Sequence, residues 1–400
     1  MQINERLANR KAKEIFEWIR KRGTVSKQDL KELSGMTSTT LTRILEELTG
    51  EGFIVETGLG KSTGGRRPIL YQTNPRYAYA FGLDISRSSS RLVLCDLHLN
   101  KLDEQEWRMD ASMVPDRLLE EAAGAAERMM ERHRLPKDRV LGLGVGAVGP
   151  LDRAEGVILD PKYFPAGGWH NVEVRRRLES RLDIPVLLDN GANTALLGEY
   201  WLDSDRRFQH LLYVHAGVGI RTAMIMGGNV VHGAVDMEGA AGQMIIQCDG
   251  KAPRENSGNY GSWESYASIY ALEQAMLSRI KIGRRTIVQL PSTWQDGELY
   301  ARMLEALRAG DPLTRELFEQ AACYFGIGLA NLLNILHPEK VILGGPLVSA
   351  NPFFFQYATQ VAVQKTYHYP DYQAVFSQSR LGDDAVAVGA AVLVINQLTA

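Results

Sequence analysis

The sequence has only three cysteines among its 400 residues, Cys95, Cys248 and Cys323. Their wide spacing forms neither a CxxC metal motif nor a disulfide framework. Because disulfides are rare in the cytosol, we interpret the three residues as buried, reduced thiols. The N-terminus lacks an apolar signal segment, and every apolar run is too short to span a bilayer. We therefore expect a cytoplasmic protein that makes no contact with a membrane.

A strong excess of charge of one sign is also lacking, since the formal net charge is −2. Residues 1–75 nevertheless carry a net charge of +4, and the remainder of the chain carries −6. A basic N-terminal segment on an acidic body indicates that the segment binds a polyanion. The hydrophobic content of 45% and the charged content of 23% are typical of a globular protein, and the length predicts two or three domains.

Residues 1–75 begin with the pattern of a helix-turn-helix. A first helix with basic residues at its end precedes a short second helix, for which Ser26 and Asp29 form a capping box. A turn at residues 34–37 leads to a third helix that starts near Ser38. The apolar face of this third helix consists of Leu41, Ile44, Leu45 and Leu48.

The third helix and a following hairpin carry side chains that suit contacts with DNA. The hairpin strands are predicted at residues 53–56 and 69–71, with a glycine-rich loop between them. Hydroxyl side chains and an arginine suit a helix in the major groove, and a cationic loop suits phosphates. The predicted DNA-binding residues are Ser38, Thr39, Thr40, Thr42 and Arg43 on the helix, and Lys61, Arg66 and Arg67 on the loop. The predicted partner is a double-stranded DNA operator, and a winged helix used for protein contacts is the alternative.

From Tyr79 onward the pattern is that of an α/β protein. Two similar strand-turn-strand segments, at residues 80–102 and 211–233, indicate a duplicated domain. Helices are predicted at 117–134, 263–280, 297–308 and 312–335, strands at 140–150 and 341–350, and a closing amphipathic helix at 381–395. Two α/β lobes with a cleft between them would bind ligands at the ends of their strands.

Five further blocks of sequence occur in a distinctive order. They are AVGPLD (147–152), DNGANTALLGE (189–199), HAGVGIRTAMIMGGNVVHGA (215–234), NILHPEKVILGGPL (334–347) and LGDDAVAVGAA (381–391). Together they resemble the ROK family of repressors, uncharacterised reading frames and sugar kinases. GGRRP (64–68) is similar to the end of the wing in the repressor branch.

The resemblance implies an α/β fold with an N-terminal winged helix-turn-helix and a two-lobed actin/hexokinase-like body. The DNA-binding domain is expected at residues 1–75 and the body at residues 79–400. One lobe is expected at about 79–200 plus the C-terminal helix, and the other at about 201–380.

The resemblance also implies that the catalytic machinery of the family's kinases is lost. Their general base is an Asp directly after the Asn of the second block, where this sequence has Gly191. The first phosphate loop, usually DIGGT, is Asp84-Ile85-Ser86-Arg87-Ser88, so side chains replace the glycines that give phosphates access to backbone amides. In the second loop, Ile220 and Arg221 stand where small residues are usual. We expect no catalytic residue and no cofactor.

The sugar-contacting residues that the resemblance implies are half preserved. Asn190 and Glu264 remain, whereas Ala240 and Gln243 replace the usual Glu and His. We predict that the effector is bound by Asn190, Glu264, Gln243 and Gly149. The family's zinc ligands, one His and three Cys, are replaced by Gln243, Glu255, Ser257 and Ser262, so we expect no bound metal.

These features predict a transcriptional regulator, a repressor of a sugar-related operon, that is not an enzyme. Its partners are expected to be a palindromic operator, a sugar or sugar-derivative effector, and a second copy of the chain in a homodimer. One alternative is a body without small-molecule sensing that responds to a protein partner or serves as a dimerisation scaffold. An active sugar kinase is the least favoured interpretation.

Overall fold

The computed structural model describes residue 7 and residues 9–60, 67–202, 208–236, 240–254, 258–290, 298–367 and 372–399. The chain forms two compact units. Unit 1 comprises residues 1–207 and 384–400, and unit 2 comprises residues 208–383. The N-terminal segment predicted as a domain of its own belongs to unit 1. The chain therefore leaves unit 1 once and returns to it with its C-terminal segment.

The N-terminal segment of unit 1 contains three helices and a small antiparallel sheet with the strand order β1-β3-β2. The elements are α1 (Arg10–Arg22), β1 (Val25–Ser26), α2 (Lys27–Ser34), α3 (Ser38–Gly50), β2 (Ile54–Leu59) and β3 (Ile69–Thr73). The predicted capping box is confirmed, since Ser26 Oγ accepts from the Asp29 amide at 3.2 Å and Asp29 Oδ2 accepts from the Ser26 amide at 2.7 Å. The predicted third helix is also confirmed, with its four leucine and isoleucine side chains buried.

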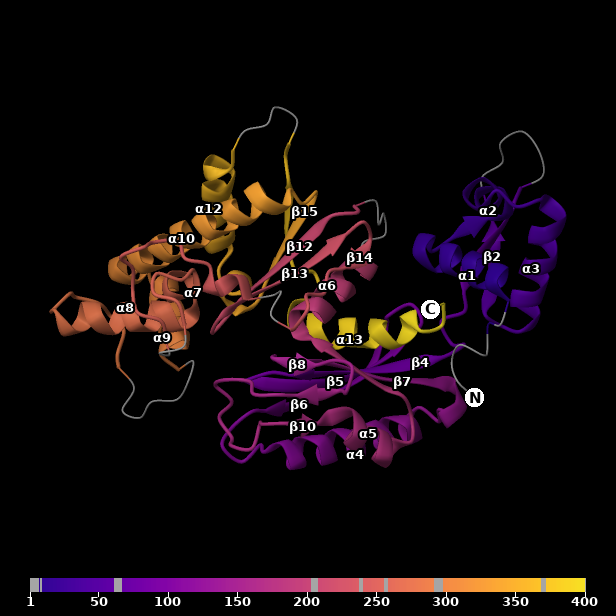
Figure 1. Ribbon diagram of the computed structural model, residues 1–400, viewed down its shortest axis with the longest axis horizontal. Helices are drawn as coiled ribbons and strands as arrows, with labels where there is room; N and C mark the ends of the chain where they lie inside the picture. The colour runs from indigo at the N-terminus through magenta and orange to yellow at the C-terminus, as the bar shows by residue number, and fades with distance from the viewer. Residues whose placement is uncertain are drawn as a thin grey trace. The chain divides into compact units, whose positions relative to one another are not determined.

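The rest of unit 1 is built on a five-stranded sheet with the order β11-β7-β4-β5-β6 (Figure 1). Its strands are β4 (Tyr79–Ile85), β5 (Ser89–Asp96), β6 (Lys101–Arg108), β7 (Val140–Ala147) and β11 (Val186–Asn190). Its helices are α4 (Pro115–Arg132), α5 (Val174–Leu182), α6 (Gly191–Leu202) and α13 (Ala385–Asn396). Three two-residue strands, β8 (Leu151–Asp152), β9 (Val157–Ile158) and β10 (Val172–Glu173), form a small separate sheet. Helices α4 and α5 cover one face of the large sheet, and α13 covers the other.

Helix α13 is packed between the sheet and α6. A Cβ at Gly82 or Gly144 would lie 1.8 Å from the carbonyl oxygen of Ala387 or Ala390, so these strand glycines let the helix backbone rest on the sheet. The prediction that this helix is amphipathic is wrong. Most of its residues are buried, because it contacts the sheet on one side and α6 on the other.

Unit 2 has a sheet with the corresponding order, β16-β15-β12-β13-β14. Its strands are β12 (Leu211–Ala216), β13 (Ile220–Met226), β14 (Asn229–Val230), β15 (Lys340–Gly344) and β16 (Val375–Gln378). Its helices are α7 (Glu264–Ala267), α8 (Ile269–Lys281), α9 (Glu298–Arg308), α10 (Pro312–Leu336), α11 (Pro346–Ser349) and α12 (Pro352–Lys365). In both units an antiparallel strand meander is extended by two parallel strands, which confirms the predicted repeat of a hairpin unit.

Several features of unit 2 differ from the prediction. Cys248 is exposed and Cys323 is half-buried, although both were expected to be buried. The strand expected at residues 341–350 ends at Gly344 and is followed by α11. The helix expected at residues 263–280 is divided, because Ser268 has an extended backbone and its Oγ accepts from the Ala271 amide at 3.1 Å as the cap of α8. Helix α12 and strand β16 were not predicted. In the described part of the chain, none of the helices combines the length and the apolar character that crossing a bilayer requires.

Candidate DNA interface and effector site

The first turn of α3 presents polar side chains on the surface of the N-terminal segment. Thr37 caps the helix, and its Oγ1 accepts a hydrogen bond from the Thr40 amide at 3.3 Å. Ser38, Thr39 and Arg43 are exposed. The leucine and isoleucine side chains of α3 are buried on its other face. The predicted base-contacting residues therefore include three that lie on one exposed end of the helix.

Thr42 is engaged within this segment. Its hydroxyl donates to the Ser38 carbonyl at 2.9 Å and accepts a hydrogen bond from Lys27 Nζ. Lys27 is the first residue of α2, so this bond links the N-terminal ends of α2 and α3. An ammonium group at this place suits a phosphate contact, and the sequence analysis missed it. The signal that could have found it is a lysine directly after the capping serine.

The hairpin of β2 and β3 carries the second group of predicted DNA-binding residues. The Gly60 amide donates to the Pro68 carbonyl at 2.8 Å, which closes the hairpin next to its loop. Arg67 is exposed at this end. Lys61 and Arg66 lie outside the described residues.

Three parallel strands of unit 1 end at the same edge of the sheet. Ile85 of β4 pairs with Ala147 of β7, and Ala147 pairs with Asn190 of β11. Gly149 follows two residues after Ala147. In α/β proteins, ligands bind at the carboxyl ends of such strands. Two of the predicted effector residues, Asn190 and Gly149, are therefore brought together at this edge.

Polar side chains at the end of β11 organise the start of α6. Asn190 Oδ1 accepts from the Ala192 amide at 3.0 Å. The buried carboxylate of Asp189 accepts from Asn193 Nδ2 at 3.0 Å and lies 3.8 Å from Arg153 Nη1. Asp189 thus organises the local structure at the start of α6.

The turn after β4 is fastened by an arginine side chain. Arg87 Nε donates to the Lys162 carbonyl at 2.8 Å, and its guanidinium carbon lies 5.6 Å from the centroid of the Tyr163 ring. A phosphate loop works because backbone amides can approach the phosphates without intervening side chains. Here the corresponding turn is tied to a neighbouring loop, a contact that sequence reasoning did not foresee.

Gln243 and Glu264, the other two predicted effector residues, lie together in unit 2. Gln243 Nε2 donates to Glu264 Oε1 at 2.6 Å, and the Ile220 amide donates to Glu264 Oε2 at 3.3 Å. Gln243 Oε1 also accepts from the Asn259 amide at 3.0 Å. Gln243 therefore fixes both the Glu264 carboxylate and the segment around Asn259.

Two glycines make room for the Glu264 carboxylate. A Cβ at Gly219 would lie 3.0 Å from Glu264 Oε2, and a Cβ at Gly242 would lie 2.9 Å from it. Gly219 directly precedes Ile220, in the segment that corresponds to the second phosphate loop. In this chain a glycine at position 219 makes room for the Glu264 carboxylate, whether or not a phosphate binds there.

The residues that replace the family's zinc ligands are only partly described. Ser262 Oγ lies 2.7 Å from Ser265 Oγ in a hydrogen bond, and Glu255 and Ser257 lie outside the described residues. Within the described ranges, His, Cys, Asp and Glu side chains form no group of three or more that could hold a metal ion. That the protein binds no metal stays a prediction.

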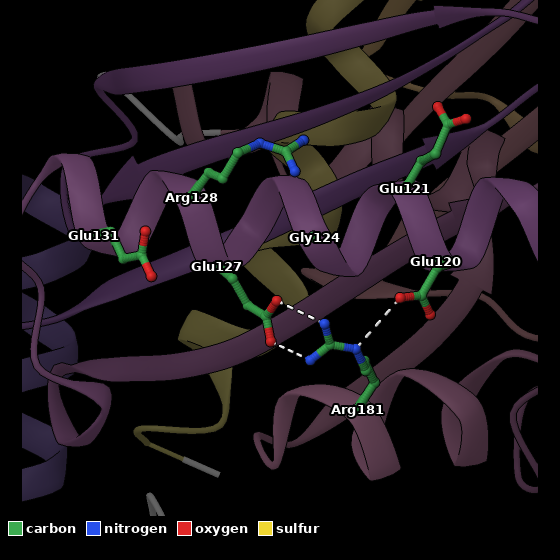
Figure 2. Close-up of a pocket in the computed structure, with 7 residues that line it drawn as sticks. All are labelled: Glu120, Glu121, Gly124, Glu127, Arg128, Glu131 and Arg181. Atoms are coloured by element: carbon green, nitrogen blue, oxygen red, sulfur yellow. Dashed lines mark hydrogen bonds and ion pairs between the residues drawn. The ribbon is translucent and has the colours of Figure 1, made fainter.

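A hollow along α4 is lined mainly by charged side chains, and Arg181 pairs with two of them. Figure 2 shows Arg181 of α5 between Glu120 and Glu127 of α4. Arg181 Nη2 lies 2.9 Å from Glu127 Oε2, and Arg181 Nε lies 3.5 Å from Glu120 Oε1. Exposed ion pairs of this kind stabilise a protein little. We interpret the hollow as solvated surface, because none of the predicted effector residues lines it.

Comparison with known proteins identifies the body. Residues 80–397 match the family model described as the ROK family. The chain belongs to the ROK family. This ROK protein is 28% identical over 377 residues to the xylose repressor of Caldicellulosiruptor bescii, which covers 94% of the chain and 92% of that repressor. It is 28% identical over 283 residues to a glucokinase of Halalkalibacterium halodurans, which covers 69% of the chain and 82% of that kinase.

A solved structure has the same fold over almost the whole length of this ROK protein. It is a ROK family transcriptional regulator, described as a homologue of the Escherichia coli MLC protein, with a TM-score of 0.77 and 22% identity. The match covers 97% of this chain and 96% of the other. Coverage of 94% and 97% extends beyond residues 80–397 into the N-terminal segment.

Proposed function

We propose that this ROK protein is a DNA-binding transcriptional regulator, a repressor of a sugar-related operon, and that it is not an enzyme. The observation that carries the proposal is the N-terminal segment, where Ser38, Thr39 and Arg43 are exposed at the start of α3. With its three helices and hairpin, this segment is a winged helix-turn-helix whose third helix enters the major groove. The similarity to a xylose repressor over 94% of the chain supports the same function.

Selection of bound genomic fragments tests this function directly. The full chain is incubated with sheared genomic DNA, and the retained fragments are sequenced. We expect enrichment of a palindromic sequence near genes of sugar uptake or breakdown, because two half-sites match a homodimer. D-xylose, D-glucose and N-acetyl-D-glucosamine are then tested for a change in affinity for the recovered operator. Failure to enrich any fragment over bulk DNA would contradict the proposal.

Asn190 of unit 1 is proposed as a contact of the effector. It lies at the strand edge described above, and its Nδ2 group suits a hydroxyl. Replacement of Asn190 by alanine should reduce the rise in melting temperature that the active sugar produces, since only a ligand that binds the folded state raises it.

One observation favours the alternative that the body responds to a protein partner or serves as a dimerisation scaffold. Both carboxylate oxygens of Glu264 already accept hydrogen bonds from the protein. A melting temperature that stays unchanged with all three sugars would support this alternative, and a rise with one of them would exclude it.

The variant Gly191→Asp is expected to fold and to remain inactive as a kinase. A Cβ at position 191 would meet its nearest neighbour, Val386 Cγ1, at 3.5 Å, which is an ordinary contact. A carboxylate at position 191 should not restore catalysis for two reasons. The side chain of Arg87, in the turn where phosphate would bind, donates a hydrogen bond to the Lys162 carbonyl, and Gln243 donates a hydrogen bond to the Glu264 carboxylate. ADP release with ATP and the three sugars is the measurement, and wild type is the control. Steady turnover by the variant would show that Gly191 alone separates this chain from a kinase.

A further inference from the structure

A buried polar cluster joins the N-terminal segment to the rest of unit 1. Arg20 of α1 has a side chain only 4% exposed, and its Nε and Nη2 donate to Glu17 Oε2 at 3.1 and 2.9 Å. Its Nη2 also donates to Asn396 Oδ1, at the end of α13, at 2.9 Å. Its guanidinium carbon lies 3.9 Å from the ring centroid of Trp201, near the end of α6. Thr399 Oγ1 completes this Arg20 cluster by donating to Glu17 Oε2 at 2.9 Å.

The distribution of charge in the Arg20 cluster suits a contact that opens and closes. Both charged groups, Glu17 and Arg20, belong to α1, whereas Trp201, Asn396 and Thr399 contribute neutral groups. Burial raises the pKa of Glu17, but the charges of Arg20 and Lys21 and the hydrogen bonds from Thr399 and Lys21 together lower it below its ordinary value, so the carboxylate stays ionised. When the two surfaces separate, the ion pair remains together on α1 and no unpaired charge is left buried in the body, which would be costly.

Helix α6 runs from the candidate effector edge to this cluster. It starts directly after Asn190 and contains Trp201 as its second-last residue. The twelve residues of α6 span about 18 Å, and residues 192–200 are buried. The helix therefore connects the two places as one continuous element. It packs along α13, whose last residue is Asn396. Trp201 and Asn396, two of the groups that hold Arg20, therefore lie at the ends of two helices that pack on each other.

On the other side of the cluster, α1 is the scaffold of the DNA-binding segment. It packs against α2, α3 and β3 through Ala12, Ile15, Phe16 and Ile19. A second attachment lies at residues 73–77, where Phe53 stacks on Tyr77 with a centroid distance of 4.1 Å and Thr73 Oγ1 bonds His98 Nε2 at 2.9 Å. The Arg20 cluster and this second attachment thus hold the DNA-binding segment at two separate places.

We propose that Arg20 and Trp201 are positioning residues for operator binding, and that the Arg20 cluster couples the effector edge to the DNA-binding segment through α6. This inference rests on the proposed function. Effector contact at Asn190 shifts α6, the shift alters the contact of Trp201 with Arg20, and the orientation of α3 changes with α1. Cation–π contact is the part of the cluster that a single substitution removes without leaving a charge unpaired.

The test is the variant Trp201→Leu in the full chain, with Trp201→Phe as the conservative variant. Operator affinity is measured with and without D-xylose, D-glucose and N-acetyl-D-glucosamine, and sugar binding is followed separately by melting temperature. We expect the active sugar to change wild-type operator affinity about fivefold or more, and to change that of Trp201→Leu by less than about twofold. Trp201→Phe should keep the wild-type response, because a ring still faces Arg20. The rise in melting temperature with sugar should persist in both variants.

Two further measurements separate coupling from a merely structural role. Trp107→Leu makes the same chemical change at a buried position of β6, and should lower the melting temperature while the sugar response of operator binding persists. Without sugar, Trp201→Leu should bind the operator about fivefold more weakly, because its two DNA-binding segments are no longer held for paired half-sites. An unchanged sugar-free affinity overturns the proposal. A wild-type-like sugar response in Trp201→Leu also overturns it, whereas a wild type that ignores all three sugars contradicts the proposed sensing instead.

Discussion

Replacement of Gly389 by alanine is expected to lower the free energy of unfolding of unit 1 by about 3 kcal/mol or more. A Cβ at Gly389 would lie 1.6 Å from the Thr194 carbonyl oxygen. The carbonyl oxygen belongs to the backbone of α6, and the position of the Cβ is fixed by the backbone of α13, so no side-chain rotation relieves the clash. The two helices must separate, and α13 then loses its contact with the sheet. In a unit of this size, the melting temperature should fall by roughly 6–12 °C.

Gly124→Ala is the matched control for this prediction. It makes the same change in a helix of the same unit, α4, where the nearest atom to a new Cβ is the flexible Arg128 Nη1 at 3.2 Å. Alanine is about 1 kcal/mol better than glycine in a helix, so this variant should be as stable as wild type or slightly more stable. Equal melting temperatures for Gly389→Ala and wild type would mean that α6 and α13 pack less closely than described.

Arg43→Ala is expected to weaken operator binding about tenfold or more and to relax the sequence preference at the base pairs that Arg43 contacts. Arg43 is exposed one turn after the start of α3, where a recognition helix meets base edges. Alanine and arginine are both good helix formers, so α3 itself should persist. Affinity is measured by gel shift on the selected operator and on single-base variants of it.

The control for Arg43 is Arg76→Ala, which removes the same charge from the turn after β3, next to the C-terminal end of α3. The Arg76 amide donates to Asn74 Oδ1 at 3.1 Å, and Asn74 Nδ2 donates to the Gly52 carbonyl, beyond the end of α3, at 2.9 Å. Loss of the Arg76 side chain should change operator affinity by less than about twofold. Equal losses from Arg43→Ala and Arg76→Ala would indicate a non-specific effect of charge, and would contradict the proposed docking of α3.

The elements that could be predicted from the sequence are those that depend on residues close to one another in the chain. Ser26 and Asp29 are three residues apart, so their capping box could be recognised, and the 3.6-residue period of the apolar side chains defined α3. Asn190 and Gly149 were placed at strand ends because a strand that ends in polar residues and glycine is itself a local pattern. The presence of a similar hairpin unit in each of the two lobes was predicted from two similar segments of sequence.

The missed features depend on contacts between distant segments. Periodicity could not show that α13 is buried on both sides, because the second side is covered by α6, almost 200 residues earlier. The approach of Trp201 to Arg20 joins residues from separate elements, and neither residue stands in a recognised motif. Ser268 divides a helix through its side-chain cap, although its neighbours are compatible with a continuous helix.

The late position of α13 in the chain has a consequence for biosynthesis. The five strands of the large sheet in unit 1 emerge from the ribosome before residue 191, but the helix that covers the glycines of β4 and β7 emerges only after all of unit 2. At translation rates of about 5–20 residues per second, this face of the sheet waits roughly 10–40 s for α13. Unit 2 is continuous in sequence and can mature during that interval. A nascent chain therefore cannot fix α1 against Asn396 until synthesis is almost complete.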